Sequence, residues 1–456
     1  MNYFLVPLGC QMNISDSERI RTVLESVGYT ACDREEDADI LGIVACSVRQ
    51  KSIDKVYSRI HRWNTWKDSR SLLTFVSGCI LPADRSEFLK RFDLVLAIEE
   101  IESLPEMIRH YGVVTAASVG GTAGKTTDNE ENAGGERDIR TGFWQVTPHY
   151  SSPVEAFVPI QNGCDKFCTF CAVPYTRGRE ISRPSGDILA EVSDLVDRGY
   201  RSITLLGQNV NSYGLDRRSS EMRFASLLRE VGSIIGDRKT WVYFTSPHPH
   251  DMSDDVLEAI AGFESLANQI HLPIQSGDDA VLRRMNRNYR IADYRRVVQS
   301  IRSILPDATL FTDIIVGFNG ETMEEFDRTS AAVEEFAFQM AYIAMYSPRP
   351  GAASAKWDDD VPQTEKKRRY HALSETLLAV AAPYTRGLIG KTLTVLVTGY
   401  ARKEGFLTAH TEGRIPVLLP ADHDRFVVKP GDFVPVLIQE ARPLSIAGVP
   451  VFGERE

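Results

Sequence analysis

Three cysteines in one short segment have a spacing that suits metal chemistry. Three residues separate Cys164 from Cys168, two separate Cys168 from Cys171, and the segment follows an apolar run that predicts a strand. Thiolates are the usual ligands of iron–sulfur clusters, and a cubane cluster contains four irons. Three cysteines therefore leave one iron without a protein ligand, free to bind a small molecule through oxygen and nitrogen. The spacing predicts a cubane cluster with one open coordination site.

A zinc site is the alternative for the same three thiols. Structural zinc takes four ligands, so a histidine would have to complete the set. The candidates for that ligand are His271 and the pair His248 and His250. We favour the cluster because it needs no fourth side chain.

Three further cysteines favour a second cluster in the N-terminal part of the chain. Cys10 and Cys79 each follow a glycine, and Cys46 directly follows an apolar run. Each comes at the end of a predicted strand, where open α/β sheets place their sites. The sequence does not require the three positions to be adjacent. Cys32 has no such setting and is predicted to be a structural thiol.

The elements that must position this second triad alternate between strand and helix. Apolar runs at residues 3–8, 40–45, 72–77 and 94–97 predict buried strands, and residues 16–27 and 52–63 predict helices. This alternation is typical of a parallel α/β sheet. We assign residues 1–114 to an N-terminal α/β domain.

A stretch rich in Gly, Ala, Thr and acidic residues follows, and we assign residues 115–150 to a linker or loop. Its Gly124-Lys125-Thr126 resembles the end of a phosphate-binding loop. That motif needs glycine where Val119 stands, and no strand leads into the stretch. A phosphate-binding loop is therefore not favoured.

Residues 151–385 repeat strand, then helix. Strands are predicted at residues 156–161, 202–206, 242–245, 269–272, 310–316 and 340–345. Six such units predict a (β/α)6-type partial barrel with its chemistry at the strand ends. Short β-like runs separated by turn residues then predict a small antiparallel β-barrel over residues 386–453, of a size used for single-stranded nucleic acid. The fold class is α/β with this barrel appended.

Composition narrows the class of protein. The chain has 456 residues, a formal net charge of −10 and 7 cysteines. An odd number of cysteines does not favour a disulfide framework. The negative net charge argues against a protein that binds nucleic acid through its overall charge. No apolar run is long enough to span a bilayer and no signal segment is recognisable. We expect no membrane association and a cytoplasmic location.

The Cys164 segment strongly resembles the C-x-x-x-C-x-x-C signature of the radical-SAM superfamily, and nearly the whole chain resembles the methylthiotransferase family within it. The segments that carry the second resemblance are Gly-Cys-Gln-Met-Asn (9–13), Cys-Ser-Val-Arg-Gln-Lys (46–51), Gly-Cys (78–79), Gln-Asn-Gly-Cys-Asp-Lys-Phe-Cys-Thr-Phe-Cys (161–171), Pro-Tyr-Thr-Arg-Gly-Arg-Glu (174–180), Leu-Gly-Gln-Asn-Val (206–210), His-Leu-Pro-Ile-Gln-Ser-Gly (271–277) and Tyr-Ser-Pro-Arg-Pro-Gly (346–351). The tail is loosely similar to the family's TRAM RNA-binding barrel.

The resemblance implies an activity. Segments 46–51 and 174–180 are similar to the MiaB branch, which converts N6-isopentenyladenosine 37 in the tRNA anticodon loop to its 2-methylthio form. It implies two [4Fe–4S] clusters and S-adenosyl-L-methionine, with catalysis at the cluster of Cys164, Cys168 and Cys171 and sulfur carried at the cluster of Cys10, Cys46 and Cys79. There, a first S-adenosylmethionine methylates the sulfur. A second, cleaved at the Cys164 cluster, gives the radical that removes hydrogen from C2 of the adenine.

Family position also implies contacts to S-adenosylmethionine. Phe170 would lie near its adenine, and Gln208 and Asn209 would bind its methionine end. Ser246 and Gln275 lie at similar strand ends. Polar strand-end turns are the alternative interpretation for these four polar residues.

The implied partners are the tRNA anticodon stem-loop and a reductant such as flavodoxin or ferredoxin, and we expect a monomer. The sequence does not identify the sulfur donor. Two rival functions remain: the same chemistry on threonylcarbamoyladenosine 37 or on a ribosomal protein aspartate, or a non-catalytic iron–sulfur protein that binds RNA or transfers electrons.

Basic residues that could contact RNA phosphate fall into three groups, and a solvated helix face is the alternative for each. The group next to the Cys164 loop has the best position. The groups are Arg177, Arg179 and Arg183; Arg283, Arg284, Arg287, Arg290, Arg295 and Arg296; and Lys366, Lys367, Arg368 and Arg369.

The cysteine count predicts the metal content. Protein purified without oxygen should carry about eight irons, four for each cubane cluster. Elemental analysis checks this, and stoichiometric zinc without iron would contradict it.

Overall fold

The computed structural model describes residues 1–48, 50–117, 139–217, 220–423 and 426–451. These divide into an N-terminal unit, Met1–Ser151 with Tyr175–Arg177, and a C-terminal unit, Ser152–Pro174 with Gly178–Glu456. Gly124, Lys125, Thr126 and most of the proposed linker lie outside the described residues. The described parts of the linker, residues 115–117 and 139–150, belong to the N-terminal unit.

The N-terminal unit contains a five-stranded parallel sheet in the order β2-β1-β3-β4-β5. Strands β3 and β4 are buried along their whole length, as expected for the centre of a sheet covered on both faces. The predicted α/β domain is confirmed. Its elements are β1 (Asn2–Pro7), α1 (Gln11–Ser26), β2 (Thr30–Ala31), η1 (Glu35–Asp37), β3 (Ile40–Cys46), α2 (Gln50–Trp66), β4 (Leu73–Cys79), α3 (Pro82–Phe88), β5 (Leu94–Val95), η2 (Ile98–Ser103), α4 (Leu104–Ala117) and η3 (Ile139–Gln145).

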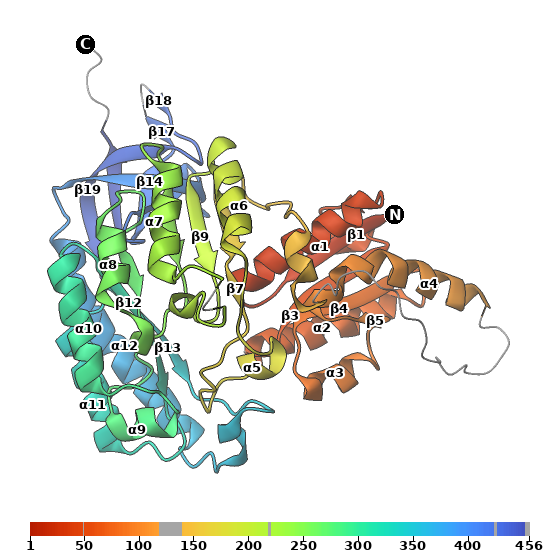
Figure 1. Cartoon of the computed structure of the whole chain (residues 1–456), viewed down its shortest axis with the longest axis horizontal. Helices are drawn as coiled ribbons and strands as arrows, with labels where there is room; N and C mark the ends of the chain where they lie inside the picture. Colours follow the sequence, from red (N-terminus) through yellow and green to blue (C-terminus); the bar gives the residue numbers. More distant parts are fainter. Residues whose placement is uncertain (49, 118–138, 218–219, 424–425, 452–456) are drawn as a thin grey trace. The chain divides into compact units, whose positions relative to one another are not determined.

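The C-terminal unit begins with two three-stranded parallel sheets, β10-β9-β6 and β11-β12-β13. A parallel bridge joins Val242 of β10 to Leu266, just before β11, and so continues the strand series from one sheet to the next. Helices α7, α8, α10 and α11 lie outside these strands (Figure 1). The predicted (β/α)6-type partial barrel is confirmed.

The elements of this partial barrel are β6 (Glu155–Pro159), β7 (Gln161–Asn162), α5 (Val173–Thr176), β8 (Ile181–Ser182), α6 (Ser185–Asp197), β9 (Ser202–Leu206), η4 (Val210–Ser212), α7 (Phe224–Ile235), β10 (Trp241–Phe244), η5 (Pro249–Asp251), α8 (Asp254–Ala261), β11 (Gln269–His271), α9 (Asp279–Arg284), α10 (Ile291–Ile304), β12 (Thr309–Val316), α11 (Met323–Phe336), β13 (Met340–Met345), η6 (Ala353–Lys356) and α12 (Gln363–Arg386).

The tail forms a closed five-stranded barrel in the order β14-β15-β16-β20-β19. Its pairings are antiparallel except between β16 and β20, which pair in parallel over Val417 and Leu418. Alternating apolar residues such as Val395, Leu407 and Val436 fill its interior. The predicted small barrel is confirmed. Its strands are β14 (Thr392–Tyr400), β15 (Phe406–Thr411), β16 (Pro416–Pro420), β19 (Phe433–Arg442) and β20 (Ser445–Pro450), with the hairpin β17 (Asp422–His423) and β18 (Phe426–Val427) beside them.

The turn between β15 and β16, residues 412–414, contacts the amino ends of the partial-barrel strands. The Thr309 hydroxyl, at the start of β12, donates to the Gly413 carbonyl at 2.8 Å, and Arg414 donates to the Thr204 hydroxyl of β9 at 2.9 Å. The Arg414 guanidinium also lies 3.8 Å from the ring centroid of Tyr243. The small barrel is thus fixed to the strand ends opposite to those where the chemistry is expected.

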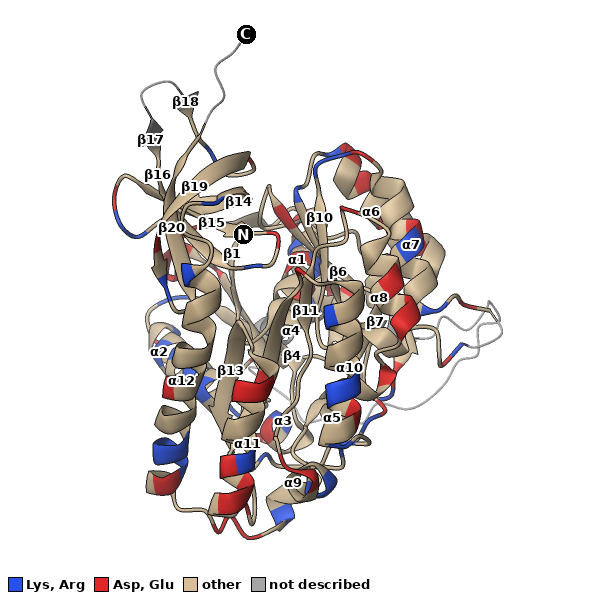
Figure 2. Cartoon of the chain, turned by 90° about the vertical axis from the view of Figure 1, so that its left-hand side faces the viewer, with Lys and Arg blue, Asp and Glu red and all other residues tan. Residues whose placement is uncertain are grey.

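Charged side chains cover the outer helices. Lys and Arg are interspersed with Asp and Glu on α10, α11 and α12, α8 carries only acidic residues, and the partial-barrel strands carry few charges (Figure 2). Such mixed faces are typical of solvated helices. In the part of the chain that the structure describes, no helix is both long and apolar enough to cross a membrane.

His410 lies at the contact between the two barrels and makes it sensitive to acid. Its ring lies 5.8 Å from that of Trp241 and 5.9 Å from that of Tyr243, between centroids, and Nδ1 donates to the Thr411 carbonyl at 2.8 Å. Burial, and secondarily Arg414, lowers the pKa of His410 from 6.5 to about 4. A lowered histidine pKa gives stability that is present above pH ~6.5 and is lost as the pH falls toward 4.

Replacing His410 with Gln should remove this acid sensitivity. Between pH 7 and pH 5 the wild type should lose about 1–2 kcal/mol more unfolding free energy than His410→Gln, because only the wild type must exclude a proton from this site. Denaturant unfolding of the C-terminal unit at the two pH values measures the difference. An equal loss in both proteins would contradict the assignment.

Candidate active site

The Cys164–Cys171 loop is held on one side by the β7–β8 hairpin. Gly163 has φ +78°, and the amide of Cys164 donates to the Gly178 carbonyl at 3.2 Å. A Cβ atom at Gly163 would lie 2.1 Å from the Arg179 carbonyl oxygen. Glycine is therefore required here by both the left-handed backbone and the close approach of the hairpin.

The other side of the loop is held by residues that follow α9. The Thr169 amide donates to the Met285 carbonyl at 3.0 Å, and its hydroxyl donates to the Arg284 carbonyl at 2.8 Å. The Phe170 ring packs edge-on against Phe318, with 6.5 Å between centroids, at the border of an apolar cluster. The loop is thus fixed before any cofactor binds.

The three thiols of this loop lie in low-dielectric surroundings. Cys164 and Cys168 are buried and Cys171 is partly exposed. Burial raises the pKa of Cys164 and of Cys171 to about 12. Metal binding must therefore displace the proton of each thiol. The half-buried side chain of Arg287 donates to the Cys168 sulfur at 3.4 Å.

The N-terminal triad gathers at one edge of its own sheet. Cys46 and Cys79 end β3 and β4 and are paired in register, and Cys10 precedes α1. The Asn13 Oδ1 atom lies 3.5 Å from the Cys79 sulfur and 4.0 Å from the Cys10 sulfur. A Cβ atom at Gly9 would lie 2.9 Å from the Cys46 sulfur. All three thiols therefore surround one small region, and Cys10 is exposed on its open side.

The described residues do not form a conventional site for a single metal ion. Among the described residues, no three His, Cys, Asp or Glu side chains converge so that they could hold one metal ion. A cubane binds each thiolate through a different iron, so its ligands need not converge. The three histidines considered for zinc bond elsewhere: His271 to Asp313, His250 to Asp251, and His248 to the His250 amide.

Cys32 lies outside both triads. Its thiol donates to the Tyr3 carbonyl at 3.4 Å and to the Arg34 carbonyl at 3.3 Å. These bonds fit the structural role that the sequence predicts.

The polar residues predicted to bind S-adenosylmethionine all lie beyond the carboxyl ends of barrel strands. Gln208 and Asn209 follow β9, Ser246 follows β10 with φ 60°, and Gln275, with φ 68°, bridges to Ile314 of β12. Within the described residues, Gln208 Oε1 and Asn209 Oδ1 are buried without a hydrogen-bond partner. A buried acceptor without a protein partner can be satisfied by a water molecule or by a group of a bound ligand.

Asp251 connects this polar edge to the cysteine loop. It accepts from Asn209 Nδ2 at 3.0 Å and from Lys166, which lies between Cys164 and Cys168, at 2.5 Å. Burial alone would raise the pKa of Asp251, but hydrogen bonds from His250, Lys166 and Asn209 lower it. The carboxylate therefore stays charged and holds the loop to the end of β9.

Most of the basic residues predicted to contact RNA pair within the protein. Four of them are buried, so the prediction is wrong for these four, and it stays a prediction for the exposed ones: Arg177, Arg183, Lys366 and Arg369 are the buried residues. Arg177 and Arg183 are buried; Arg183 bonds to Glu191, and Arg179 pairs with Asp165. Arg284 pairs with Glu325, Arg287 bonds to Cys168, and Arg295 and Arg296 pair with Glu335 and Asp293. Lys366 and Arg369 are buried against Asp359 and Glu321, and Arg368 pairs with Glu365.

Sequence reasoning missed Asp251 and Lys166, and it missed that Arg177 and Arg287 contact cysteines. The position of Lys166 inside the cysteine motif was the one available signal. The arginines carried none, because a buried and a solvated arginine look alike in a sequence.

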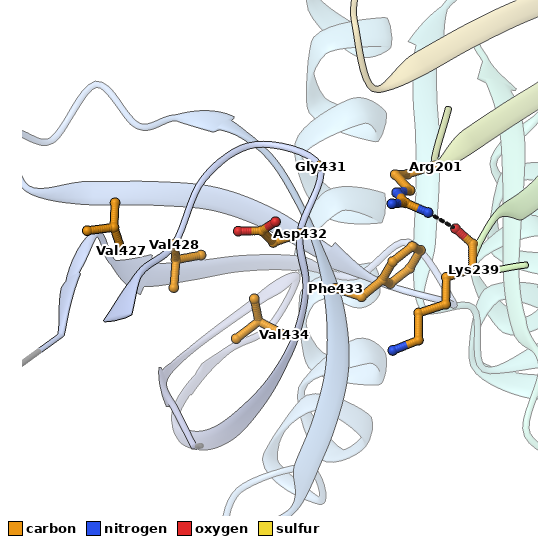
Figure 3. A pocket seen from close by; sticks show the side chains of 8 residues that line it. All are labelled: Arg201, Lys239, Val427, Val428, Gly431, Asp432, Phe433 and Val434. Carbon is orange, nitrogen blue, oxygen red and sulfur yellow. Dashed lines mark hydrogen bonds between the residues drawn. The ribbon is translucent and has the colours of Figure 1, made fainter. Parts of the chain in front are cut away.

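Two hollows open on the small barrel. One, of about 290 Å³, lies between Arg201 and Lys239 of the partial barrel and residues 427–434, and Figure 3 shows the Phe433 ring beside the two basic residues. The other, of about 530 Å³, runs over the outward faces of β15, β16 and β20. At its rim the Lys403 ammonium lies 3.7 Å from the ring centroid of Phe406, and Arg442 stands nearby in the lining.

Three family models match consecutive parts of the chain. "Uncharacterized protein family UPF0004" matches residues 2–98, "Radical SAM superfamily" matches residues 158–333, and "TRAM domain" matches residues 386–451. These ranges correspond to the α/β sheet, the partial barrel and the small barrel.

Curated relatives match almost end to end. Proteins named tRNA-2-methylthio-N(6)-dimethylallyladenosine synthase from Anaplasma marginale and Burkholderia ambifaria are 35% and 36% identical, and the alignment covers 98% of this chain and 96% of each relative. The protein of that name from Cronobacter sakazakii is 36% identical over 98% of this chain and 92% of its own. A solved radical S-adenosylmethionine methyltransferase from Kitasatospora setae is 12% identical, with a TM-score of 0.49 over 78% of this chain and 74% of that one.

Gly163→Ala should prevent assembly of the cluster at Cys164. The new Cβ would clash with the Arg179 carbonyl, and alanine tolerates φ +78° poorly. Iron content should fall by about half, from eight to about four per chain.

Gly178→Ala is the matched control, because Gly178 has φ +73° but nothing within 4 Å of its Cβ position. It should keep the wild-type iron content. If the two variants retain equal iron, the close approach at Gly163 is not what shapes the loop.

Proposed function

The chain belongs to the family of tRNA-2-methylthio-N(6)-dimethylallyladenosine synthases, and from this we infer that it is a radical-SAM methylthiotransferase. It adds a methylthio group to C2 of N6-isopentenyladenosine 37 in the tRNA anticodon loop. The observation that carries this function is the end-to-end match at 35–36% identity, which includes all three parts of the fold.

Two [4Fe–4S] clusters are part of the proposal. Cys164, Cys168 and Cys171 would hold one, and Cys10, Cys46 and Cys79 the other, each with one iron left for a non-protein ligand. The support is the donor chemistry: two sets of three thiols, each gathered within one region of its own unit. When bound, the first cluster and S-adenosylmethionine supply the radical that removes hydrogen from an adenine carbon.

The chain's own residues would bind and orient the cofactor. The partnerless oxygens of Gln208 and Asn209 can accept from its amino group, and Ser246 and Gln275 present polar atoms at neighbouring strand ends. Phe170, at the border of an apolar cluster, offers a ring face or edge for the adenine. Asp251 bonds to both Asn209 and Lys166 and so fixes Asn209 relative to the cysteine loop.

The RNA would be held chiefly by the small barrel, since few of the basic residues predicted from the sequence are free. Its 530 Å³ groove combines apolar strand residues with Lys403, Phe406 and Arg442, a set that can stack a base and neutralise phosphate. Chemistry on C2 requires the adenosine to leave the base stack, and an unpaired anticodon loop makes that step easier. A cytoplasmic location, a monomeric state and reduction by flavodoxin or ferredoxin belong to the same proposal.

Single cysteine variants separate the two clusters. Cys164→Ala should abolish 5′-deoxyadenosine formation, whereas Cys46→Ala should retain it and lose methylthio insertion. Chromatography of the cleaved cofactor and mass spectrometry of tRNA nucleosides measure the two outcomes. Cys32→Ala, a thiol of the same unit outside both triads, should behave as wild type.

Several results would count against this function. Identical defects in Cys164→Ala and Cys46→Ala would contradict the assignment of cofactor cleavage to one cluster and of methylthio insertion to the other. If a deletion strain lost the methylthio group from threonylcarbamoyladenosine or from a ribosomal protein instead, that molecule would be the substrate. Failure of reduced protein to cleave S-adenosylmethionine would leave a non-catalytic iron–sulfur protein.

A further inference from the structure

A buried arginine contacts the N-terminal cysteine triad. Residues Tyr175–Arg177 pack with the N-terminal unit, although the residues on both sides of them belong to the C-terminal unit. Arg177 Nε donates to the Cys79 sulfur at 2.9 Å. Its Nη2 donates to Asp16 Oδ2 at 2.5 Å and to Asn13 Oδ1 at 3.2 Å.

The surroundings of Arg177 fix the direction of its N–H groups. The side chains of the Arg177–Asp16 pair are 2% and 1% exposed, so the guanidinium is charged and its fork is oriented by the carboxylate. Asn13 is itself fixed, because its Nδ2 donates at 2.6 Å both to the Leu8 carbonyl and to the Ala45 carbonyl. With Nη2 held by both Asp16 and Asn13, Nε points at the sulfur.

A donor aimed at a cysteine ligand changes the electronics of a cluster. Hydrogen bonds to the sulfurs and the net charge nearby are two of the factors that set an iron–sulfur reduction potential. Reduction adds negative charge to the cluster and its sulfurs, which a guanidinium stabilises. Asp16 acts in the opposite direction through its charge, but its carboxylate bonds to Nη2 of the guanidinium and not to the sulfur.

We propose that Arg177 is a positioning residue that acts through Cys79 to raise the reduction potential of the N-terminal cluster. This inference rests on the proposed function, because it needs a cluster at Cys10, Cys46 and Cys79. It assigns Arg177 to the sulfur-carrying centre, whereas the sequence suggested a contact with RNA phosphate.

The test uses the full chain with Cys164, Cys168 and Cys171 all changed to Ala, so that only the N-terminal cluster forms. Iron and sulfide are measured first, and the potential is then measured by an EPR-monitored redox titration without oxygen. Added Arg177→Met should raise the oxidised-to-reduced ratio about tenfold at a fixed potential, equal to a midpoint lower by about 59 mV for a one-electron couple.

Three further variants separate electronics from folding. Asp16→Asn should shift the ratio in the opposite direction, because it removes negative charge and keeps the N–H···S bond. Arg177→Lys keeps the charge but loses the planar fork, and should restore part of the shift. Arg179→Met is the matched control: Arg179 is 70% exposed and pairs with Asp165, so the ratio should stay at the wild-type value.

The outcomes are distinguishable. If the triple alanine protein binds no cluster, the second cluster of the proposed function is wrong, whatever Arg177 does. If the cluster forms and Arg177→Met has the wild-type potential, the inference is overturned. If Arg177→Met fails to assemble the cluster, Asp16→Asn and Arg177→Lys decide: unchanged potentials in both would overturn the inference as well.

Discussion

Parallel strands end at the same edge of a sheet, and both cysteine sets depend on this constraint. In the N-terminal unit, Cys46 and Cys79 are paired across β3 and β4, so their thiols are neighbours by register alone. The third thiol is brought in by the tight turn after β1, where Gly9 has φ +113°. Gly78, with φ +101°, lets β4 approach the Ala45 backbone, since a Cβ atom there would lie 2.6 Å from its carbonyl oxygen. The register and these turns therefore bring together thiols that are far apart in the sequence.

Burial of the thiols opposes their ionisation, and in each unit an arginine contacts one of the sulfurs. Burial raises the pKa of Cys79, Cys164 and Cys171, which opposes the thiolate form that metals bind. Arg177 donates to Cys79 and Arg287 donates to Cys168. A guanidinium withdrawn from solvent must itself be satisfied. Arg177 has Asp16 for this, whereas Arg287 bonds to the Pro273 carbonyl and the Tyr289 hydroxyl.

Features with a strong local signal were predictable from the sequence. The buried strand β3 is a continuous apolar run, and the cysteine spacings are visible without a structure. Boundaries were less accurate: Cys46 and Cys79 are the last residues of strands, not loop residues, and α1 begins at Gln11 instead of residue 16. That early start reflects tertiary packing, because Asn13, Ser15 and Asp16 are polar residues buried inside the unit. The roles of basic residues were not predictable, since burial and pairing depend on partners distant in sequence, as with Lys366 and Arg369.

The polar residues at the two ends of the partial-barrel strands make different interactions. At the amino ends, Thr204, Asn268 and Thr309 bond to the turn formed by residues 412–414, and those polar groups are satisfied within the protein. At the carboxyl ends, Gln208 and Asn209 keep buried acceptors that no described residue satisfies. Unpaired buried acceptors cost free energy unless a ligand or water donates to them. On β9, Thr204 therefore contributes to the contact with the small barrel, whereas Gln208, beyond the carboxyl end, keeps an acceptor available to the cofactor that we propose binds there.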